Sequence, residues 1–174
     1  MLFLQVLIGL FPKNRIGNYI RLLFWKLKLK NKSLIYFGHQ ATIVGHKLID
    51  LGARFTLGDF SSIEIGMSEP IYIGNDVSCA RHTYFRSANH KFDKDDVPIN
   101  QQGHSSKIID FNGTKYSIVI EDNVMIGAYS IILSGTHIKS GSVIAAGSVV
   151  SGSFEENSII VGNPARTVKK RINE

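Results

Sequence analysis

The chain has 174 residues, a single cysteine and a formal charge of +6. Its length suits one domain with a substantial core, and one cysteine excludes an internal disulfide. Cys79 falls on an inward position of the repeat described below. We therefore interpret its thiol as a packing group in a reducing, cytoplasmic protein and not as a nucleophile.

Residues 1–11, MLFLQVLIGLF, are apolar. They fall short of the roughly 20 residues that a membrane span needs. They also lack the basic start and the small-residue cleavage site of a signal peptide. Neither a membrane span nor a signal peptide is therefore predicted at this end of the sequence.

Residues 1–33 are predicted to form a basic amphipathic segment. No acidic residue precedes Asp50, whereas basic residues are frequent, at Lys13, Arg15, Arg21, Lys26, Lys28, Lys30 and Lys32. Apolar residues recur among them at helical spacing, at Ile16, Ile20, Leu23, Phe24 and Leu27. Such a segment either covers the open end of a repeat protein or lies on an anionic membrane surface, and both remain open. Nucleic-acid binding is not indicated, because no recognised motif accompanies the charge.

Residues 34–171 carry a repeat of six residues. It is clearest near the C-terminus, where an aliphatic residue returns at Ile120, Ile126, Ile132, Ile138, Ile144 and Val150. A helical face repeats near 3.6 residues and a strand alternates at two, so a period of six indicates a solenoid of short strands and turns. Three units would close one triangular coil, with the aliphatic side chains inside and mostly small residues at the corners. Glycines between the units fit the turns.

The same repeat is weaker near the start of this region, at Leu51, Leu57 and Ile63. It shifts at an insertion containing Pro70 and resumes at Ile73, Cys79 and Phe85. A β-sandwich is the alternative, but it would need alternating residues with turn signals about every 8–12 residues, and the repeat shows neither. An all-β solenoid is therefore predicted.

Residues 91–116 interrupt the repeat with a polar, aperiodic stretch, which is predicted to be one long protruding loop. His90 lies at its root and is expected to point outward. A largely neutral imidazole on a rigid coil suits a general base, although it could equally hydrogen-bond the loop root alone. His104, within the loop, is a weaker candidate for positioning an acceptor. The loop also carries three carboxylates, those of Asp93, Asp95 and Asp96. They would either orient His90 or be simply solvated.

The C-terminal tail concentrates positive charge, at Arg166, Lys169, Lys170 and Arg171. This charge suits phosphate groups, although a basic tail is often just solvated. A metal site is not predicted, because a zinc ion would need three converging ligands and the spacing of the histidines does not suggest them.

Three motifs carry a resemblance to a known family: IGNDVSCARHTYFRSANHKFD, VPINQQGH, and IEDNVMIGAYSIILSGTHIKSGSVIAAGSVV running on to VGNPAR. With them the chain resembles the hexapeptide-repeat acyltransferases, in particular bacterial sugar O-acetyltransferases of the maltose and galactoside group, over about residues 50–171. The resemblance implies an all-β, left-handed parallel β-helix that forms a homotrimer. It also implies acetyl-CoA as the acetyl donor, bound in the groove between subunits.

The resemblance further implies roles for single residues. His90 would take the proton from a sugar hydroxyl while that oxygen attacks the thioester directly, and the backbone N–H of Ala128 would stabilise the oxyanion. Small side chains, those of Ala146 and Ser151, would line the pantetheine groove. Arg166 and Lys169 would meet the nucleotide phosphates. Asn89 joins His104 as a weak candidate for binding the acceptor.

The chain departs from the family pattern in two ways. Met125 stands where many relatives have a tryptophan, so the surface that stacks on the pantetheine arm or the acceptor is altered. Ser87 and Ala88 stand where polysaccharide-type relatives often carry an aspartate and a second histidine. These departures leave open the acceptor type and the group that orients His90.

The sequence thus predicts a cytoplasmic acetyl-CoA-dependent O-acetyltransferase for a surface-polysaccharide or O-antigen precursor. The basic N-terminus adds the inner face of the plasma membrane as a location and a lipid-linked glycan as an acceptor. The alternatives are an antibiotic acetyltransferase, a sugar N-acetyltransferase and a non-catalytic trimeric scaffold. A metal-dependent carbonic anhydrase would need a histidine spacing that the chain lacks.

Overall fold

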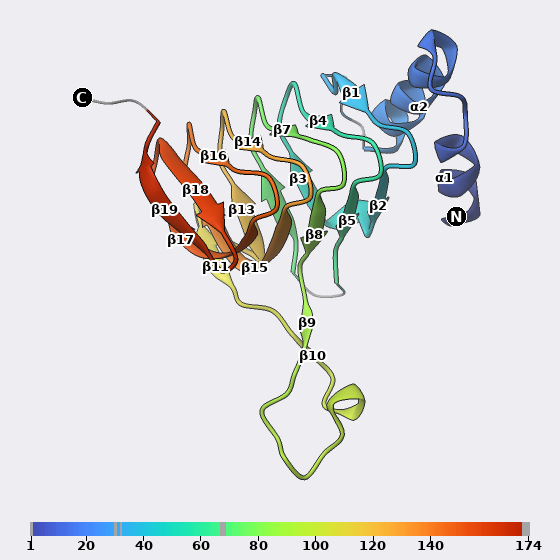
Figure 1. Ribbon diagram of the computed structural model, residues 1–174. Coiled ribbons are helices and arrows are strands. Elements are labelled where there is room, and N and C mark those ends of the chain that lie inside the picture. The colour runs from blue at the N-terminus through green and yellow to red at the C-terminus, as the bar shows by residue number, and fades with distance from the viewer. Residues whose placement is uncertain (1, 30, 32, 67–68, 172–174) are drawn as a thin grey trace.

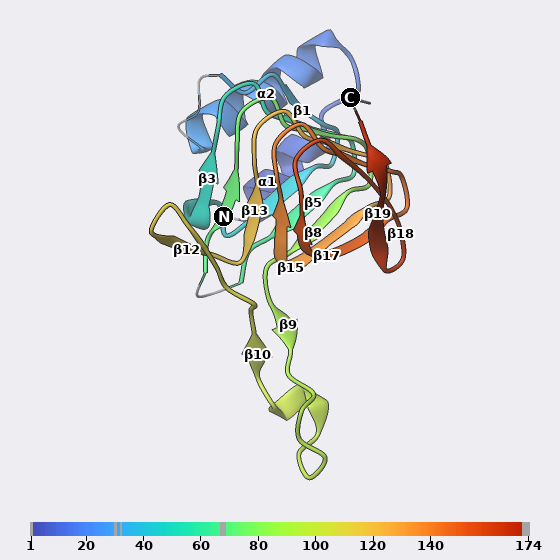
Figure 2. The same ribbon diagram turned by 90° about the vertical axis from the view of Figure 1, so that its left-hand side faces the viewer.

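A computed structural model describes residues 2–29, 31, 33–66 and 69–171. Lys30 and Lys32, counted above among the basic residues, lie outside this range. The structure is a parallel β-solenoid of about six turns with two helices at its N-terminal end (Figure 1). One long loop projects from its side (Figure 2).

The coils stack into three faces. The first face holds β1 (Tyr36–Phe37), β4 (Thr56–Leu57), β7 (Ser78–Cys79), β14 (Met125–Ile126), β16 (Val143–Ile144) and β18 (Ser158–Gly162). The second holds β2 (Thr42–Val44), β5 (Ser62–Glu64), β8 (Tyr84–Arg86), the start of β15 (Ile131–Ile138) and the start of β17 (Val149–Phe154). The third holds β3 (Ile49–Leu51), β6 (Ile71–Ile73), β13 (Ile118–Ile120) and the ends of β15 and β17.

The register between coils explains the six-residue period. Ile126 pairs with Ile144, and Ile120 pairs with Ile138, so one coil takes 18 residues, or three units of six. Leu57 pairs with Cys79, 22 residues later. The extra residues of the earlier coils lie at corners, for example in the short 3-10 helix η1 (His46–Leu48). This is why the repeat is weaker there in the sequence.

The core is the predicted aliphatic column. Its side chains are almost fully buried, at Ile120, Ile126, Ile132, Ile138, Ile144 and Val150. Burial of one such side chain contributes about 1.5–3 kcal/mol. The small corner residues are buried as well, and their hydroxyls donate to backbone carbonyls; Ser142 Oγ, for example, bonds Glu155 O at 3.1 Å. Cys79 is buried in this core, and burial raises the pKa of its thiol, which confirms a packing role.

Two helices, α1 (Leu2–Gly9) and α2 (Arg15–Lys28), cover the first coil. Asn14 starts α2 by accepting the backbone N–H of Gly17 at 2.8 Å. The indole of Trp25 stacks on Phe37, with 4.3 Å between ring centroids and 18° between planes. This contact closes the open end of the core, so the helical segment is a cap.

The buried face of α2 is not the set of apolar residues that recurs at helical spacing, although one of them, Phe24, packs partly against the core. The buried face consists of Gly17, Arg21 and Trp25, whereas Ile16 and Leu27 are 71% and 72% exposed. The reason lies in the link between the helices. The Arg21 guanidinium donates to Phe11 O at 2.5 Å, and a Cβ on Gly17 would collide with Pro12 O. These contacts with the link between the helices hold Arg21 against the solenoid, so Ile16 and Leu27 face outward.

The C-terminal end folds back as β19 (Ala165–Lys170), which pairs antiparallel with β18. Val161 pairs with Arg166, and Ile159 pairs with Lys169. Because β19 runs along the free edge of β18, the last strand of the first face is paired, which limits edge-to-edge association.

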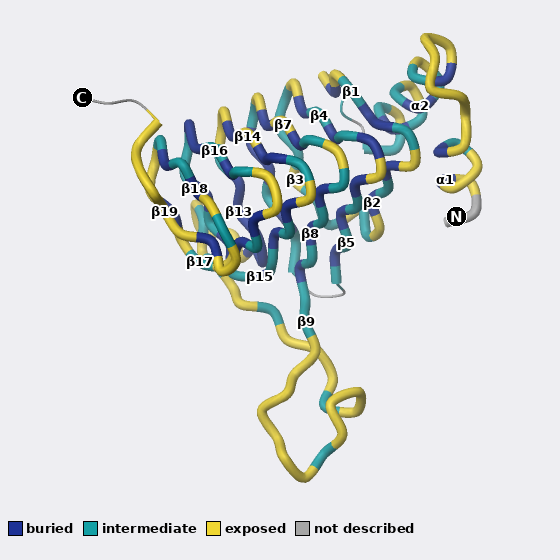
Figure 3. The backbone as a smooth tube through the Cα atoms, in the orientation of Figure 1, coloured by how far each residue is buried: buried dark blue, intermediate teal, exposed yellow. Residues whose placement is uncertain are grey.

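The protruding loop is confirmed for residues 91–107, which are mostly exposed (Figure 3). It contains the 3-10 helix η2 (Ile99–Gln101), and β9 (Asn89–His90) pairs with β10 (His104–Ser105) at its root. Residues 109–116 instead return to the solenoid as a hairpin of β11 (Ile109–Phe111) and β12 (Thr114–Tyr116). Tyr116 Oη donates to Asp50 Oδ2 at 2.6 Å, a long-range contact that the polar sequence gave no sign of.

None of the helices in the described ranges has both the length and the apolar character that crossing a membrane requires.

Candidate active site

His90 is held at the root of the loop by a two-residue ribbon. It lies directly opposite His104 in the antiparallel pairing of β9 with β10. The two imidazole centroids are 4.3 Å apart, with ring planes inclined by 37°. Lys91 N–H donates to Gly103 O at 3.0 Å and closes the ribbon. The ribbon therefore holds two exposed imidazoles side by side.

The base of the ribbon is tied to the solenoid. The buried Ser87 accepts the backbone N–H of Gly66 at 2.5 Å, and Asn89 Nδ2 lies 3.4 Å from Ser134 Oγ. Asn89 thus anchors the root of the loop. The expectation that Asp93, Asp95 and Asp96 orient His90 is not supported, because they lie exposed beyond the ribbon and the residue that faces His90 is another histidine.

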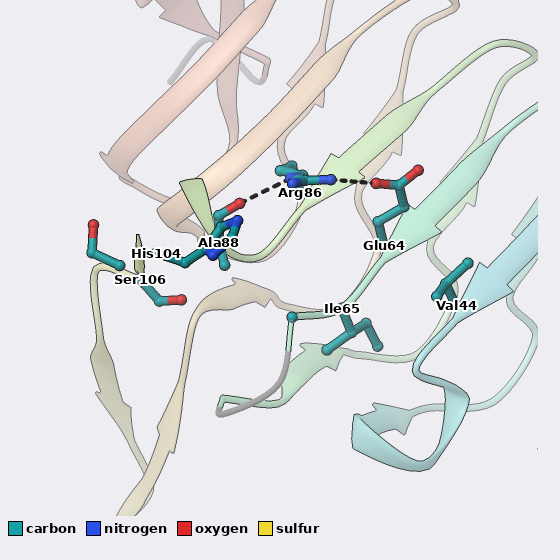
Figure 4. A pocket seen from close by; sticks show the side chains of 9 residues that line it. Val44, Glu64, Ile65, Arg86, Ala88, His104 and Ser106 are labelled. Carbon is teal, nitrogen blue, oxygen red and sulfur yellow. Dashed lines mark hydrogen bonds and ion pairs between the residues drawn. The ribbon is translucent and has the colours of Figure 1, made fainter. Parts of the chain in front are cut away.

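A cavity of about 480 Å³ opens beside the ribbon (Figure 4). Its wall comes from three successive coils and the loop, and consists of Val44, Glu64, Ile65, Gly66, Arg86, Ala88, His104, Ser105 and Ser106. An apolar floor with a few convergent polar groups is typical of small-molecule sites, and the volume lies within the usual range of about 300–1,000 Å³. We refer to this cavity as the loop pocket.

The polar group of the loop pocket is an ion pair across neighbouring coils. Arg86 Nη1 lies 2.5 Å from Glu64 Oε2, and Tyr84 Oη donates to the same oxygen at 2.7 Å. Arg86 Nε also donates to Ala88 O at 2.9 Å. Hydrogen bonds to Tyr84 and Glu64 raise the pKa of Arg86, while burial and the hydrogen bond to Glu64 raise the pKa of Tyr84. The pocket therefore presents a fixed, formally neutral pair of donors and acceptors.

Ala128 does not lie beside His90 within one chain. It belongs to the corner between the first and second faces, called here the first corner, and precedes the start of β15. His90 follows β8 at the opposite edge of the second face, and β8 pairs with β15 through Ile131 and Leu133. Three strand residues span about 10 Å. The second face thus separates the predicted base from the predicted oxyanion donor.

The predicted lining of the pantetheine groove is divided in the same way. Ala128 and Ala146 occupy equivalent positions of successive coils, and Gly127 packs so closely on Ala146 that a Cβ would lie 2.5 Å from its backbone nitrogen. Ser151 is exposed in β17. It lies between the part of β17 that pairs in the second face and the part that pairs in the third, at the edge from which the loop leaves. Ser151 and the two alanines are therefore not brought together in one chain.

The basic tail continues the first corner. Arg166 is exposed on β19 opposite Val161, and the adjacent Gly162 donates its N–H to Ser148 Oγ in the coil corner that holds Ala146. Ala128, Ala146 and Arg166 thus follow one another along the first corner. Lys169 pairs with Ile159 at the other end of β18, so it lies further from this corner.

An aromatic stack at the first corner was not expected from the sequence. The rings of Phe60, His82 and Tyr129 stack nearly parallel, with centroid distances of 5.0 and 4.6 Å. All three residues have φ between 58° and 61°, which L residues rarely adopt. Gly147 takes this position in the next coil and adds no ring to the stack, and Tyr129 is 61% exposed. Aligning the coils in register would have revealed the column.

Met125 is 54% exposed in β14, three residues before Ala128. Its side chain and the Tyr129 ring are the large exposed groups that flank Ala128 along the chain. Within the described ranges no three His, Cys, Asp or Glu side chains converge as metal ligands.

Residues 117–152 match the family model "Bacterial transferase hexapeptide (six repeats)". This stretch of the chain thus carries the hexapeptide repeat of bacterial transferases. WbbJ of Escherichia coli (strain K12), named as a lipopolysaccharide biosynthesis O-acetyl transferase, is 27% identical over 158 residues, which is 86% of this chain and 79% of that protein. These matches confirm the resemblance to hexapeptide-repeat acetyltransferases predicted from the sequence, and WbbJ carries the name of the predicted enzyme class.

Solved structures agree on the fold. A galactoside acetyltransferase in complex with coenzyme A superposes with a TM-score of 0.73 at 20% identity, over 97% of this chain and 77% of that one. A maltose O-acetyltransferase from Clostridium difficile 630 superposes with a TM-score of 0.63 at 25% identity, over 99% and 84% of the two chains. The hexapeptide-repeat solenoid expected for this chain is thereby confirmed.

Proposed function

We propose that this hexapeptide-repeat acetyltransferase moves an acetyl group from acetyl-CoA to a sugar hydroxyl, with His90 as the general base. The observation that carries the proposal is the His90–His104 ribbon at the rim of the loop pocket. In this proposal His90 would act beside a cavity that has both polar groups and an apolar floor. The coenzyme A in the galactoside acetyltransferase structure and the name of WbbJ support the donor and the type of acceptor.

In this mechanism His90 accepts the hydroxyl proton while the sugar oxygen attacks the thioester carbonyl. The backbone N–H of Ala128 donates to the oxygen that becomes negative. As the carbon–sulfur bond breaks, the protonated imidazole returns its proton to the leaving sulfur, so the enzyme is regenerated. A general base contributes about 10²–10⁴-fold and one oxyanion donor about 10²–10³-fold. The buried Cys79 takes no part.

The site needs two copies of the chain. His90 and Ala128 lie at opposite edges of the second face, so one copy would supply the loop pocket and the base while its neighbour supplies the first corner. A cyclic homotrimer satisfies this requirement for every copy and is part of the proposal. Along the first corner, Ala128 and Ala146 leave room for the pantetheine arm, and Arg166 would meet a phosphate.

The loop pocket would hold the acceptor. Its charged groups, Glu64 and Arg86, neutralise each other at 2.5 Å, so the pocket favours a neutral polyhydroxyl group over a strongly charged one. The Glu64 carboxylate accepts from hydroxyls and the Arg86 guanidinium donates to them, while Ser105 and Ser106 add hydroxyls at the rim. A sugar of a surface polysaccharide or O-antigen precursor fits this chemistry.

Calorimetry with acetyl-CoA, followed by turnover with a panel of sugars, tests the proposal. We expect His90→Ala to retain acetyl-CoA binding and to lose about 10²–10⁴-fold in kcat/KM. Arg166→Ala and dephospho-CoA should each weaken binding. His137→Ala, on the third face and outside the pocket lining, is the matched control. A folded protein that does not bind acetyl-CoA would instead indicate a scaffold, and full activity in His90→Ala would exclude this histidine as the base.

A further inference from the structure

The helical cap has an outer face that the solenoid does not use. Nine large apolar side chains between residues 4 and 27 are 37% to 72% exposed: Leu4, Val6, Leu7, Leu10, Phe11, Ile16, Tyr19, Leu23 and Leu27. Large exposed apolar patches on a soluble protein mark interaction sites. We call these nine residues the N-terminal patch.

Four of these side chains form one continuous stripe along α2. Ile16, Tyr19, Leu23 and Leu27 follow each other at intervals of three or four residues, so they share one side of the helix. The buried residues Arg21 and Trp25 point to the opposite side and fix the helix on the first coil. The stripe is therefore preformed, and its outward direction is set by the packing of the cap.

The charge around the patch indicates what covers it. No acidic residue precedes Asp50, and Arg15 and Lys26 are on the same helix as the stripe. A helix with an apolar stripe and a basic polar side lies in the interface of an anionic bilayer, with the stripe among the acyl chains and the cations at the headgroups. Contact between the stripes of two copies would instead bring their basic residues together.

We propose that the N-terminal patch docks this protein on an anionic phospholipid surface. Seven basic residues lie between Lys13 and Lys32, and Lys13 itself is paired with Asp59 of the solenoid. Apolar contact and charge attraction act together in such peripheral binding, and the charge contribution decreases with added salt.

Docking in this way would bring the loop pocket close to the lipid. The last turn of α1 contacts the solenoid where Gly9 O accepts the N–H of Gln40 at 3.2 Å, and Val44 of the pocket lies four residues further along. Four extended residues span about 13 Å. Resting on the proposed function, this placement favours an acceptor sugar that is carried on a lipid over a freely diffusing one.

Co-sedimentation of the full chain with vesicles tests the docking. We expect binding to phosphatidylcholine vesicles that contain phosphatidylglycerol, weak binding to pure phosphatidylcholine, and release at high salt. The double variant Leu23→Ser/Leu27→Ser should lose roughly tenfold or more in partitioning, because both side chains would leave the interface. Arg15→Gln/Lys26→Gln should lose the preference for phosphatidylglycerol. Val168→Ser, equally exposed at the opposite end of the solenoid, is the control and should bind like the parent chain.

Circular dichroism and size-exclusion chromatography accompany the assay, so that a folding defect is not mistaken for lost docking. Vesicle binding that is unchanged in the leucine variant, or equal for both lipids, would overturn the proposal. A change in oligomeric state without vesicle binding would assign the patch to a second copy and also overturn it. Acetyl-CoA binding and acetylation of a soluble sugar should stay unchanged in all these variants, which separates docking from the proposed function.

Discussion

The imidazoles of His90 and His104 lie 4.3 Å apart, although 14 positions separate them in the sequence. The β9–β10 ribbon makes this pair, and the same ribbon borders the loop pocket. Two exposed imidazoles at one rim allow a division of labour, in which His90 accepts the proton and His104 contacts the acceptor.

This division predicts different kinetic effects for the two histidines. Removal of His104 should raise the KM for the acceptor by about tenfold while kcat changes little, because a binding contact is lost and the base remains. Steady-state kinetics of His104→Ala beside His90→Ala will show the difference. If His104→Ala instead lowers kcat as strongly as His90→Ala, the roles of the two histidines would have to be exchanged.

The ion pair in the loop pocket predicts a change in acceptor binding. Glu64→Gln keeps the shape of the side chain but removes its charge, so the Arg86 guanidinium would face the pocket without its counterion. The KM for a neutral sugar should rise by about tenfold or more, and an anionic sugar should become a better substrate. A sugar panel measures this shift, with Glu156→Gln at an exposed site as control. An unchanged sugar preference would place the acceptor elsewhere.

The stacking of Trp25 on Phe37 predicts that two nearby substitutions in α2 change the free energy of unfolding by very different amounts. Trp25 is 1% exposed and stacked on Phe37, so Trp25→Ala should lower the free energy of unfolding by about 3–5 kcal/mol. Leu27→Ala, two residues away on the exposed stripe, should change it by less than about 0.5 kcal/mol. Urea denaturation of both variants checks the comparison. Equal losses would mean that the stripe also packs on the solenoid.

Asp59 predicts how the stability of the cap depends on pH. Burial alone would raise the pKa of Asp59, but hydrogen bonds from Lys13, Tyr36 and the backbone of His39 outweigh burial and lower the pKa to about 2. An unfolded aspartate titrates near about 3.9. The folded state is therefore stabilised above about pH 4, and this contribution disappears as the pH falls towards 2.

The size of this contribution is about 2 kcal/mol, which Asp59→Asn should remove at neutral pH. Thermal unfolding of the variant and the parent chain at pH 7 and at pH 2.5 measures it. The difference between their melting temperatures should be clear at pH 7 and should shrink at pH 2.5. A difference that stays constant would show that the hydrogen bonds, and not the charge of Asp59, stabilise the cap.

The sequence alone was sufficient to predict the solenoid, because its cause is local and repeated. Each six-residue unit needs one buried aliphatic residue, such as Ile126 or Ile144, and one small corner residue, such as Ser142, and a period of six persists only if every coil buries the same positions. His90 could be selected by the same reasoning, since it stands where the repeat stops.

Contacts between distant segments were decided only by the tertiary structure. Chain reversal sets His104 opposite His90, and the register between coils sets Glu64 against Arg86, 22 residues away. Helical spacing predicted part of the stripe of α2, namely Ile16, Leu23 and Leu27, but could not choose which side faces the core. That choice depends on the Arg21 hydrogen bonds to the link and on the space above Phe37, which exist only once the first coil and the helices have packed together.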